Sequence, residues 1–358
     1  MAVKVAFLIP GFADGGAQRQ CILLLNALQS DPALDVRLLH FYDGVHIDML
    51  HRNRLATQRF DSASNYDPRN LWRVWHALRR DPPDVLVTWL HACDVYGYAL
   101  RRVLPGMAWV MTERNSAYPD ELRFNLRRRL GRNADVIVAN SAKGADYWRE
   151  AGATCDIQTV PNIVPDAGAS VCVLPAIPRV VTIGRLEPQK NTHAVVKAFA
   201  LLAREHAAME FAVIGAGAEE PSLKDVATSN GAERRIDFLG FCKDVAEQLS
   251  RATLVVSMSH HEGLPNVLLE TVAAGRLAVV SDIPEHRELF GPEYPYYVAQ
   301  RTDPAAVAAA VTRALLVPKD NAVLSYARTR IKTMKMPTVV KSYKNIFVQL
   351  ASKRKPQY

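Results

Sequence analysis

Residues Ser259–Gly275 read SHHEGLPNVLLETVAAG, and this stretch is the most informative part of the chain. Two carboxylates, Glu262 and Glu270, are separated by seven residues that include a glycine, a proline and an asparagine. Pro265 suits the first turn of a helix, where its missing N–H costs nothing, and the final glycine suits a helix end. The pattern therefore predicts a tight loop that opens into a helix over residues 266–274.

The predicted helix start is suited to a diphosphate. A helix start has N–H groups without an intrahelical acceptor and carries a partial positive charge, so it attracts anions. Carboxylates repel phosphate, so we expect Glu262 and Glu270 to bind hydroxyl groups on either side of it. Glu262 would then contact a sugar, and Glu270 the ribose of a nucleotide. An ordinary loop–helix junction is the alternative interpretation.

The string EGLPNVLLE, with its E-x7-E spacing, resembles the nucleotide-sugar site of retaining glycosyltransferases of family 4. Four further elements stand before it in the order of that family: a GG loop, NADVIVANS, VPN and GRLEPQKN. The resemblance covers nearly the whole chain. It implies an α/β protein of the GT-B fold, with two Rossmann-like, doubly wound parallel-sheet domains that face a central cleft.

Composition agrees with an ordinary globular protein of two domains. The chain has 358 residues, of which 49% are hydrophobic and 22% are charged. Its apolar runs are too short to span a bilayer, and we interpret Val3–Ile9 as a buried first strand rather than a signal peptide. The five cysteines are odd in number and lack metal-type spacing, which favours reduced thiols in the cytoplasm.

Strand-like apolar runs alternate with helical stretches along the chain, which predicts parallel sheets covered by helices. The expected strands are Val3–Ile9, Val36–Phe41, Val85–Trp89, Ala108–Met111, Val136–Ala139, Ile157–Val160, Arg179–Thr182, Glu210–Ile214, Ile236–Leu239, Leu254–Ser257 and Leu277–Ser281. The proline-rich segment Pro161–Pro178 is typical of a linker. We therefore expect an acceptor-binding domain over 1–165 and a nucleotide-sugar domain over 166–335. Residues 336–358 should form a helix that crosses back to the first domain, followed by a basic tail.

A loop with two glycines follows the first predicted strand. Residues Pro10–Gln18 read PGFADGGAQ, and Gly15 and Gly16 permit a close approach of the backbone to a ligand. The third glycine of the dinucleotide fingerprint is missing, which argues against a nicotinamide-dependent dehydrogenase. The loop resembles the GG loop of family 4, although a simple strand–helix turn remains an alternative.

Two cations follow the first strand of the second predicted domain. In the segment GRLEPQKN, Arg185 and Lys190 stand at the carboxyl end of a parallel strand, where ligands bind in such sheets. Together they could neutralise a diphosphate leaving group, as the resemblance also implies. Gly215 and Gly217, in IGAGAE, fit the nucleotide-facing glycine loop of the family.

In the first domain, polar residues follow two predicted strands. His91, in TWLHACD, stands at a strand end, and family 4 members often have a histidine in this region that contacts the donor sugar. A structural histidine is the alternative. Glu113 and Arg114, in TERN, could bind sugar hydroxyls or an acceptor phosphate.

The candidate site residues fall into two groups, catalytic and donor-binding. The catalytic candidates are Glu262, Arg185, Lys190 and His91; the donor-binding candidates are Gly15, Gly16, Gly215, Gly217, Gly263, Leu264, Pro265, Asn266 and Glu270. No D-x-D triplet occurs in the sequence, so we expect no metal and no cofactor other than the nucleotide-sugar co-substrate.

Positive charge is concentrated in two places. The net charge is +8, and the last 28 residues hold seven basic residues and no acidic one, including Lys353, Arg354 and Lys355. The segment Asp120–Asn133 reads as an arginine-rich helix with three leucines in an apolar line. Either element could bind an anionic membrane surface. The alternatives are a solvated tail and an ordinary solvated helix packed by its leucines. We expect no nucleic-acid partner.

The resemblance implies transfer of a hexose or N-acetylhexosamine, with retention, from a nucleotide diphosphate that is expected to be UDP. The expected acceptor is a hydroxyl of a polyprenyl-diphosphate-linked glycan in the assembly of lipopolysaccharide, O-antigen, capsule or exopolysaccharide. The enzyme would then work in the cytoplasm, at the inner face of the membrane. A nucleotide-sugar epimerase of the same fold and a non-catalytic sugar-binding protein are the alternatives.

Overall fold

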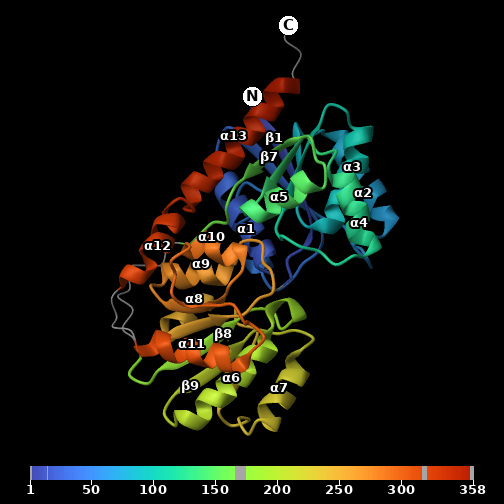
Figure 1. Cartoon of the computed structure of the whole chain (residues 1–358). Helices are drawn as coiled ribbons and strands as arrows, with labels where there is room; N and C mark the ends of the chain where they lie inside the picture. Colours follow the sequence, from blue (N-terminus) through green and yellow to red (C-terminus); the bar gives the residue numbers. More distant parts are fainter. Residues whose placement is uncertain (1, 14, 166–174, 317–320, 355–358) are drawn as a thin grey trace. The chain divides into compact units, whose positions relative to one another are not determined.

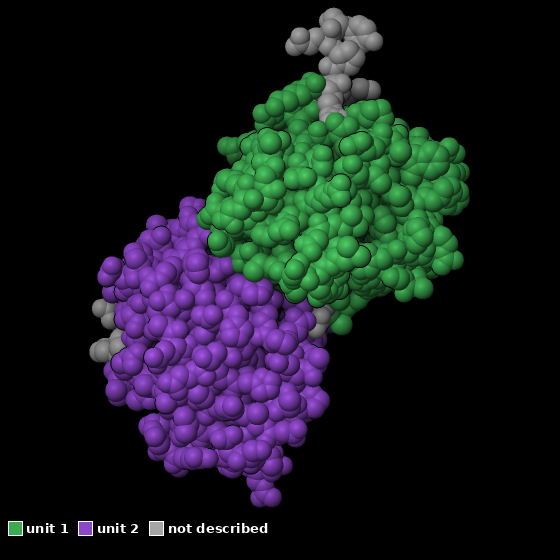
Figure 2. Space-filling model, turned by 45° about the vertical axis from the view of Figure 1, so that its right-hand side comes forward, with its two compact units in different colours: residues 1–163, 336–358 green, residues 164–335 purple. Residues whose placement is uncertain are grey.

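The computed structural model describes residues 2–13, 15–165, 175–316 and 321–354. The chain divides into two compact units, which Figure 2 shows in separate colours: residues 1–163 with 336–358 form unit 1, and residues 164–335 form unit 2. Each unit contains one parallel sheet covered by helices (Figure 1). The middle of the predicted linker, and Lys355 of the predicted tail, lie outside the described residues.

The sheet of unit 1 has the strand order β3-β2-β1-β4-β5-β6-β7, and every described pair is parallel. The strands are β1 (Val3–Gly11), β2 (Leu34–Tyr42), β3 (Ala56–Arg59), β4 (Val85–Thr88), β5 (Ala108–Glu113), β6 (Val136–Ala139) and β7 (Asp156–Thr159). All the predicted strands of this domain are present. The polar edge strand β3 was not predicted, because its four residues include no apolar run.

Helices cover both faces of this sheet, as the parallel order requires. On one face Val5 and Phe7 pack with α1 and α13; on the other Ala6 and Leu8 pack with α2 and α3. The helical segments of unit 1 are α1 (Gly16–Leu28), η1 (Ile47–Met49), α2 (Pro68–Arg80), α3 (His91–Val103), α4 (Leu122–Gly131), α5 (Ala142–Glu150) and α13 (Met336–Arg354).

The sheet of unit 2 has the order β10-β9-β8-β11-β12-β13 and is again parallel in its described pairs. Its strands are β8 (Arg179–Ile183), β9 (Glu210–Ile214), β10 (Ile236–Gly240), β11 (Leu254–Ser257), β12 (Leu277–Ser281) and β13 (Tyr297–Val298). The helical segments are η2 (Pro188–Lys190), α6 (Thr192–Glu205), α7 (Glu220–Ser229), α8 (Val245–Ser250), α9 (Asn266–Ala273), α10 (Pro284–Phe290), α11 (Pro304–Leu316), η3 (Asn321–Leu324) and α12 (Ser325–Lys332). One continuous apolar cluster forms the core of this unit.

The last helix of the chain, α13, belongs to unit 1. Tyr343 and Phe347 are buried in the core cluster that also contains α1, and the Phe347 ring meets the Phe7 ring edge to face, with centroids 6.2 Å apart. Lys344 Nζ lies 2.6 Å from Asp31 Oδ2. The chain thus leaves unit 1 before β8 and returns to it with α13.

A buried arginine, Arg276, follows the end of α9. The Arg276 guanidinium, only 2% exposed, donates hydrogen bonds to the carbonyl oxygens of Leu249 (3.1 Å) and Ser250 (2.7 Å). These carbonyls lie in the last turn of α8, where a cation also opposes the negative end of the helix dipole. Arg276 therefore stabilises the end of α8.

Helix α4 is present, and the alternative interpretation, a helix packed by its leucines, is wrong. Leu122 is 84% exposed and Leu126 is 42% exposed, whereas Phe124 and Arg127 are buried. The buried ion pairs of Arg127 turn these two leucines outward. Within the described residues, no helix combines the length and hydropathy needed to cross a bilayer.

Candidate active site

The candidate site of unit 2 lies where the strand order of its sheet reverses. The first strand of the unit, β8, pairs with β9 on one side and with β11 on the other. Loops that follow β8 and β11 therefore diverge at the carboxyl edge of the sheet, which is where ligands bind in doubly wound folds. The loop after β8 carries Arg185 and Lys190, and the loop after β11 carries Glu262.

A hydrogen bond joins these two loops through the predicted catalytic groups. Lys190 Nζ donates to Glu262 Oε1 at 2.5 Å, and Ser259 Oγ donates to the same oxygen at 2.7 Å. Glu262 is 6% exposed. Burial by itself would raise the pKa of Glu262, but the Lys190 charge and the hydrogen bonds from Lys190 and Ser259 lower it below its usual range. Glu262 is therefore an ionised, fixed acceptor at neutral pH.

A second layer of polar groups holds Ser259 in place. Ser281 Oγ, at the end of β12, donates to the Ser259 carbonyl at 2.7 Å, and His286 Nδ1 lies 2.8 Å from the Ser281 carbonyl. Burial lowers the pKa of His286 to about 4, so this imidazole is neutral. With Nδ1 directed at a carbonyl, the neutral ring carries its proton on that nitrogen. This layer fixes the loop that carries Glu262.

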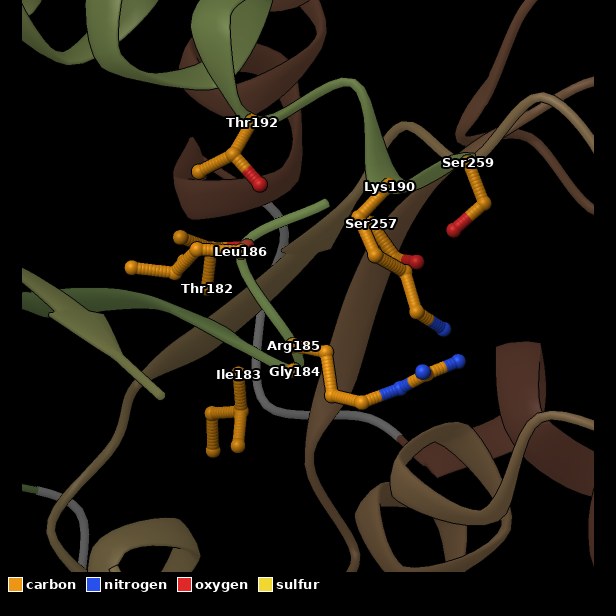
Figure 3. Close-up of a pocket in the computed structure, with 9 residues that line it drawn as sticks. All are labelled: Thr182, Ile183, Gly184, Arg185, Leu186, Lys190, Thr192, Ser257 and Ser259. Atoms are coloured by element: carbon orange, nitrogen blue, oxygen red, sulfur yellow. The ribbon is translucent and has the colours of Figure 1, made fainter. Parts of the chain in front are cut away.

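Arg185 is the more exposed of the two cations. It donates from Nη1 to Glu187 Oε1 at 2.8 Å, and its side chain is 44% exposed, against 25% for Lys190. Both cations line one pocket, together with Ser259 and the start of the β8 loop. In Figure 3 the nitrogen ends of Arg185 and Lys190 turn the same way, while Leu186 and Thr182 point elsewhere. The arrangement concentrates positive charge at the carboxyl end of β8.

Two predicted glycines support this loop through close backbone contact. Gly215 has a φ of +142°, and a Cβ atom built there would lie 1.8 Å from the Gly184 carbonyl oxygen. A Cβ atom at Gly217 would lie 2.3 Å from the Leu186 carbonyl oxygen. The backbones are also hydrogen-bonded, since Leu186 N donates to the Ala216 carbonyl at 2.9 Å. The structure thus shows a packing role for both glycines, and their contact with a nucleotide stays a prediction.

The predicted loop–helix junction is present. Helix α9 starts at Asn266 after Pro265, and Gly275 follows its end with a φ of +69°. The N-cap residue of α9 is Pro265, whose side chain makes no capping hydrogen bond. Gly263, Leu264 and Pro265 are buried in the loop before it, and Glu270 is half-buried one turn inside the helix. Their contacts with a nucleotide remain predictions.

In unit 1, His91 is the first residue of α3, directly after β4. The residue before it, Leu90, has a φ of +73°, a conformation that is strained for a leucine and persists only where the surroundings enforce it. The His91 ring packs 5.2 Å from the Phe124 ring and 6.4 Å from the Tyr66 ring, centroid to centroid. Burial, with the nearby Arg127 and Arg123 charges, lowers the pKa of His91 to about 4. A neutral imidazole at this edge can exchange hydrogen bonds with a hydroxyl.

Glu113 is a core residue, which corrects its predicted role as an acceptor ligand. It has no exposed surface, and its Oε2 accepts from Arg127 Nη1 and Trp148 Nε1, both at 2.8 Å. Its other oxygen accepts from the Tyr118 hydroxyl and from the backbone N–H groups of the next two residues. Five donors thus surround a carboxylate that cannot reach a ligand in this conformation.

Arg127 continues the buried cluster. Its Nε donates to Asp94 Oδ2 at 2.7 Å, and Thr88 Oγ1 donates to the other oxygen of Asp94 at 2.6 Å. Arg127 is 2% exposed, and burial raises the pKa of Asp94 to about 7 although two donors hold it. The predicted membrane contact of the arginine-rich helix therefore cannot include Arg127.

Arg114 has internal contacts as well. Its guanidinium lies 3.8 Å above the Trp89 ring, donates to Asn162 Oδ1 at 3.2 Å, and also donates to the Tyr343 hydroxyl. Arg114 thus connects β5 to α13, and its contact with an acceptor stays a prediction.

The loop with two glycines follows β1. Gly15 precedes α1 and Gly16 is the first residue of that helix, which is the predicted strand–loop–helix order.

Sequence reasoning missed Ser259, Ser281, His286 and Glu187 as parts of the site. Ser259 could have been found, because it stands three residues before Glu262 in the same tight loop. Glu187 could have been found in the same way, because it stands two residues after Arg185 in one loop. Ser281 and His286 depend on pairings between strands that the sequence does not display. Among the described residues, no three His, Cys, Asp or Glu side chains converge as a metal site would require.

Known protein families match both halves of the chain. Residues 14–167 match the model of Glycosyltransferase Family 4, and residues 177–330 match that of Glycosyl transferases group 1. A lipopolysaccharide core biosynthesis glycosyltransferase of Rhizobium meliloti, LpsE, is 27% identical over 270 residues, which are 73% of this chain and 74% of that protein.

A second relative and a solved structure extend the comparison. An α-1,4-N-acetyl-D-galactosaminyltransferase of Campylobacter jejuni, named for a glycan on PP-undecaprenol, is 25% identical over 280 residues, 75% of this chain and 77% of that protein. The crystal structure of Anabaena HepE with UDP-glucose superposes with a TM-score of 0.83 at 17% identity, and covers 97% of this chain and 99% of that one.

Two parallel-sheet units with these neighbours define the GT-B fold, and the protein is a glycosyltransferase enzyme. The chain belongs to glycosyltransferase family 4, of the glycosyl transferases group 1.

Proposed function

We propose that this enzyme transfers a hexose or N-acetylhexosamine from a UDP-sugar, with retention, to a hydroxyl of a lipid-linked glycan in cell-surface polysaccharide assembly. The Lys190–Glu262 pair at the β8–β11 edge is the observation that carries the proposal. In this pair Lys190, the cation that would bind the diphosphate, lies beside an ionised carboxylate that can accept hydrogen bonds from sugar hydroxyls. HepE, which is solved with UDP-glucose, supports the choice of donor. The PP-undecaprenol glycan in the name of the Campylobacter enzyme supports a lipid-linked acceptor, and the name of LpsE, a lipopolysaccharide core biosynthesis glycosyltransferase, supports a role in cell-surface polysaccharide assembly.

In this mechanism the protein mainly stabilises charge. The bond between the sugar and the diphosphate breaks as negative charge develops on the leaving phosphate, and prearranged cations and helix N–H groups lower the free energy of that state. We assign this role to Arg185, Lys190 and the start of α9, which all belong to unit 2. Glu262 holds the transferred sugar, and the leaving phosphate takes the proton of the acceptor hydroxyl as that oxygen attacks the same face.

The proposal is tested by incubating the protein with a panel of nucleotide sugars and a polyprenyl-diphosphate-linked glycan. We expect UDP release that depends on the acceptor, and a product whose anomeric configuration equals that of the donor. Acceptor-independent formation of a free sugar or epimer would instead identify an epimerase. Release of a nucleotide other than UDP would overturn the donor assignment.

The two glutamates should have separable effects on binding. Glu270→Ala should weaken the binding of UDP roughly tenfold or more, because a hydrogen bond to a charged group contributes about 1.5–3 kcal/mol. Glu262→Ala should leave UDP binding unchanged or tighter, since it releases Lys190 from its present partner. Titration calorimetry with UDP measures both, and the opposite pattern would refute the assignment.

We propose that transfer needs no metal, because Arg185, Lys190 and the start of α9 supply the positive charge for the diphosphate. Treatment with a chelator should therefore leave the initial rate within about twofold of the untreated enzyme, well below the effect of losing one charge-stabilising group. The rate of UDP release before and after dialysis against the chelator provides the measurement. A loss of activity that magnesium or manganese restores would contradict the proposal.

A further inference from the structure

We infer that His286 is a positioning residue for sugar transfer, which fixes the Glu262 carboxylate through two buried serines. His286 acts through these serines and not on the substrate itself. The inference deepens the proposed function, because it rests on Glu262 holding the transferred sugar. It adds a residue from another loop of unit 2 that sets where the carboxylate of Glu262 lies.

One line of contacts crosses the carboxyl edge of the sheet in unit 2. Strands β8, β11 and β12 are neighbours in this sheet, and the line joins the segments that follow β12 and β11. None of its four residues is more than 6% exposed. They are His286 in α10, Ser281 at the end of β12, Ser259 in the loop after β11, and Glu262 in that same loop. Because the line is buried, water cannot readily replace a lost hydrogen bond.

A single N–H group of His286 meets both polar groups of Ser281. His286 Nδ1 lies 2.8 Å from the Ser281 carbonyl oxygen and 3.2 Å from Ser281 Oγ. The ring is neutral, since burial lowers its pKa to about 4, and its proton is on Nδ1. The Ser281 hydroxyl therefore has to donate elsewhere, and it donates to the Ser259 carbonyl at 2.7 Å. His286 thus orients this hydroxyl toward the loop that carries Glu262.

The peptide groups of this loop are held from its other side. The His260 N–H donates to the Gln189 carbonyl at 2.8 Å, and Gln189 Nε2 donates to the His261 carbonyl at 2.8 Å. These bonds fix the backbone, whereas Ser259 Oγ binds the Glu262 carboxylate itself at 2.7 Å. The direction of the carboxylate therefore depends on the contacts behind Ser259.

The bond from Ser259 gains importance when the donor binds. Lys190 Nζ holds the same carboxylate oxygen of Glu262 at 2.5 Å in this structure. In the proposed function Lys190 binds the diphosphate, so Ser259 then remains to hold Glu262 toward the sugar. A shift of Ser259 would at that stage displace the carboxylate, and a displaced catalytic group lowers the rate.

Packing alone does not account for a histidine at this position. The second ring nitrogen of His286, Nε2, is buried and has no hydrogen-bond partner among the described residues. A buried polar atom without a partner destabilises a fold, so an apolar side chain of similar size would serve packing better. The N–H at Nδ1 is what distinguishes His286 from such a side chain.

Variants of His286 and Ser281 test the inference. His286→Leu removes the N–H and fills similar space, whereas His286→Asn keeps an N–H on the atom that corresponds to Nδ1. Ser281→Ala removes the hydroxyl that donates to Ser259. Tyr294→Phe is the matched control, because the buried Tyr294 hydroxyl donates to the Ala278 carbonyl at 2.6 Å, near the other end of β12.

We expect His286→Leu and Ser281→Ala each to lower the kcat of UDP release about tenfold or more. His286→Asn should stay within about threefold of the wild type, because it restores the donor to Ser281. The His286→Leu and Ser281→Ala double variant should lose no more than the worse single variant, since both changes break one line of contacts. UDP affinity, measured by calorimetry, should stay within about twofold throughout, because Arg185 and Lys190 are unchanged. Tyr294→Phe should lower the unfolding temperature and leave kcat unchanged.

Four results would overturn the inference: normal kcat in His286→Leu, an equal loss in His286→Asn, losses that multiply in the double variant, or a similar loss in Tyr294→Phe. Thermal unfolding shows whether each variant is folded. If His286→Leu is not folded, Ser281→Ala decides. A tenfold or larger loss of kcat with normal UDP affinity would then support the inference, and a normal kcat would overturn it.

Glu262→Ala separates a failure of the inference from a failure of the proposed function. A large loss of kcat in Glu262→Ala, together with a normal kcat in His286→Leu, would overturn the inference alone. A normal kcat in Glu262→Ala would overturn the proposed role of Glu262, and the inference with it. Turnover of a nucleotide sugar other than a UDP-sugar would change the donor assignment, and the same comparison of variants would be made with that donor.

Discussion

Replacing Lys190 with alanine should lower turnover at least about a hundredfold, and Arg185→Ala should have an effect of the same order. Both cations line one pocket at the carboxyl end of β8, and we expect both to stabilise the charge that develops on the leaving diphosphate. Each is bound to a carboxylate in this structure: Lys190 to Glu262, and Arg185 to Glu187. Donor binding would therefore require an exchange of partners.

The two variants should differ in which contacts of the donor they weaken, because Glu262 is buried and Glu187 is not. Lys190→Ala also leaves the buried Glu262 without its cation. It should therefore weaken the contacts with the transferred sugar as well as those with the diphosphate. Arg185 is more exposed and its partner Glu187 can turn to solvent, so Arg185→Ala should act mainly on the diphosphate. Steady-state rates of UDP release measure both, with Lys197→Ala and Arg251→Ala as controls on exposed positions of the same unit. Near-normal turnover in both test variants would remove Arg185 and Lys190 from the catalytic set.

Sequence patterns predicted the sheets well because parallel strands are buried on both faces and read as short apolar runs. Val136–Ala139, Glu210–Ile214 and Leu277–Ser281 have the predicted bounds in the structure. The edge strands β3 and β13 were missed, because one is polar and the other has two residues. An edge strand is recognised through its neighbour in the sheet, and that pairing is not visible in a local pattern.

Placement of the polar site residues was predictable only in part. A position directly after a strand of a doubly wound sheet brings a side chain to one edge, and this was enough to group Arg185, Lys190 and Glu262. The direct Lys190–Glu262 bond and the layer behind Ser259 depend on the order of strands, which the sequence does not contain.

The orientation of α4 has an electrostatic cause. The alternative interpretation of this helix expected its leucines to face inward, as apolar residues do in most helices. Two carboxylates on other elements, Asp94 and Glu113, form a buried acceptor site that only a cation can neutralise. Arg127 fills it, because an unpaired buried carboxylate would destabilise the fold more than an exposed leucine does.

Arg127→Leu should therefore lower the free energy of unfolding of unit 1 by about 3–5 kcal/mol, the usual loss when one partner of a buried ion pair is removed. Two carboxylates, Asp94 and Glu113, would stay buried without a cation. Arg128→Leu, one residue along but exposed, should change the stability by only about 0.5 kcal/mol or less. Denaturant titration monitored by the fluorescence of the buried Trp148, which donates to Glu113, measures the loss.

The pH dependence of this loss identifies its cause. The pKa of Asp94 is already raised to about 7 by burial, and removal of Arg127 would raise it further. A carboxyl group whose pKa is higher in the folded state than in the unfolded state stabilises the fold when it is protonated. Its contribution to the free energy of unfolding is therefore greatest at low pH, and it is lost as the pH rises through the folded-state pKa. The Arg127→Leu defect should accordingly be smaller near about pH 5 than near about pH 8. A defect that is equal at both values would point to lost packing around the side chain instead of the unpaired carboxylates.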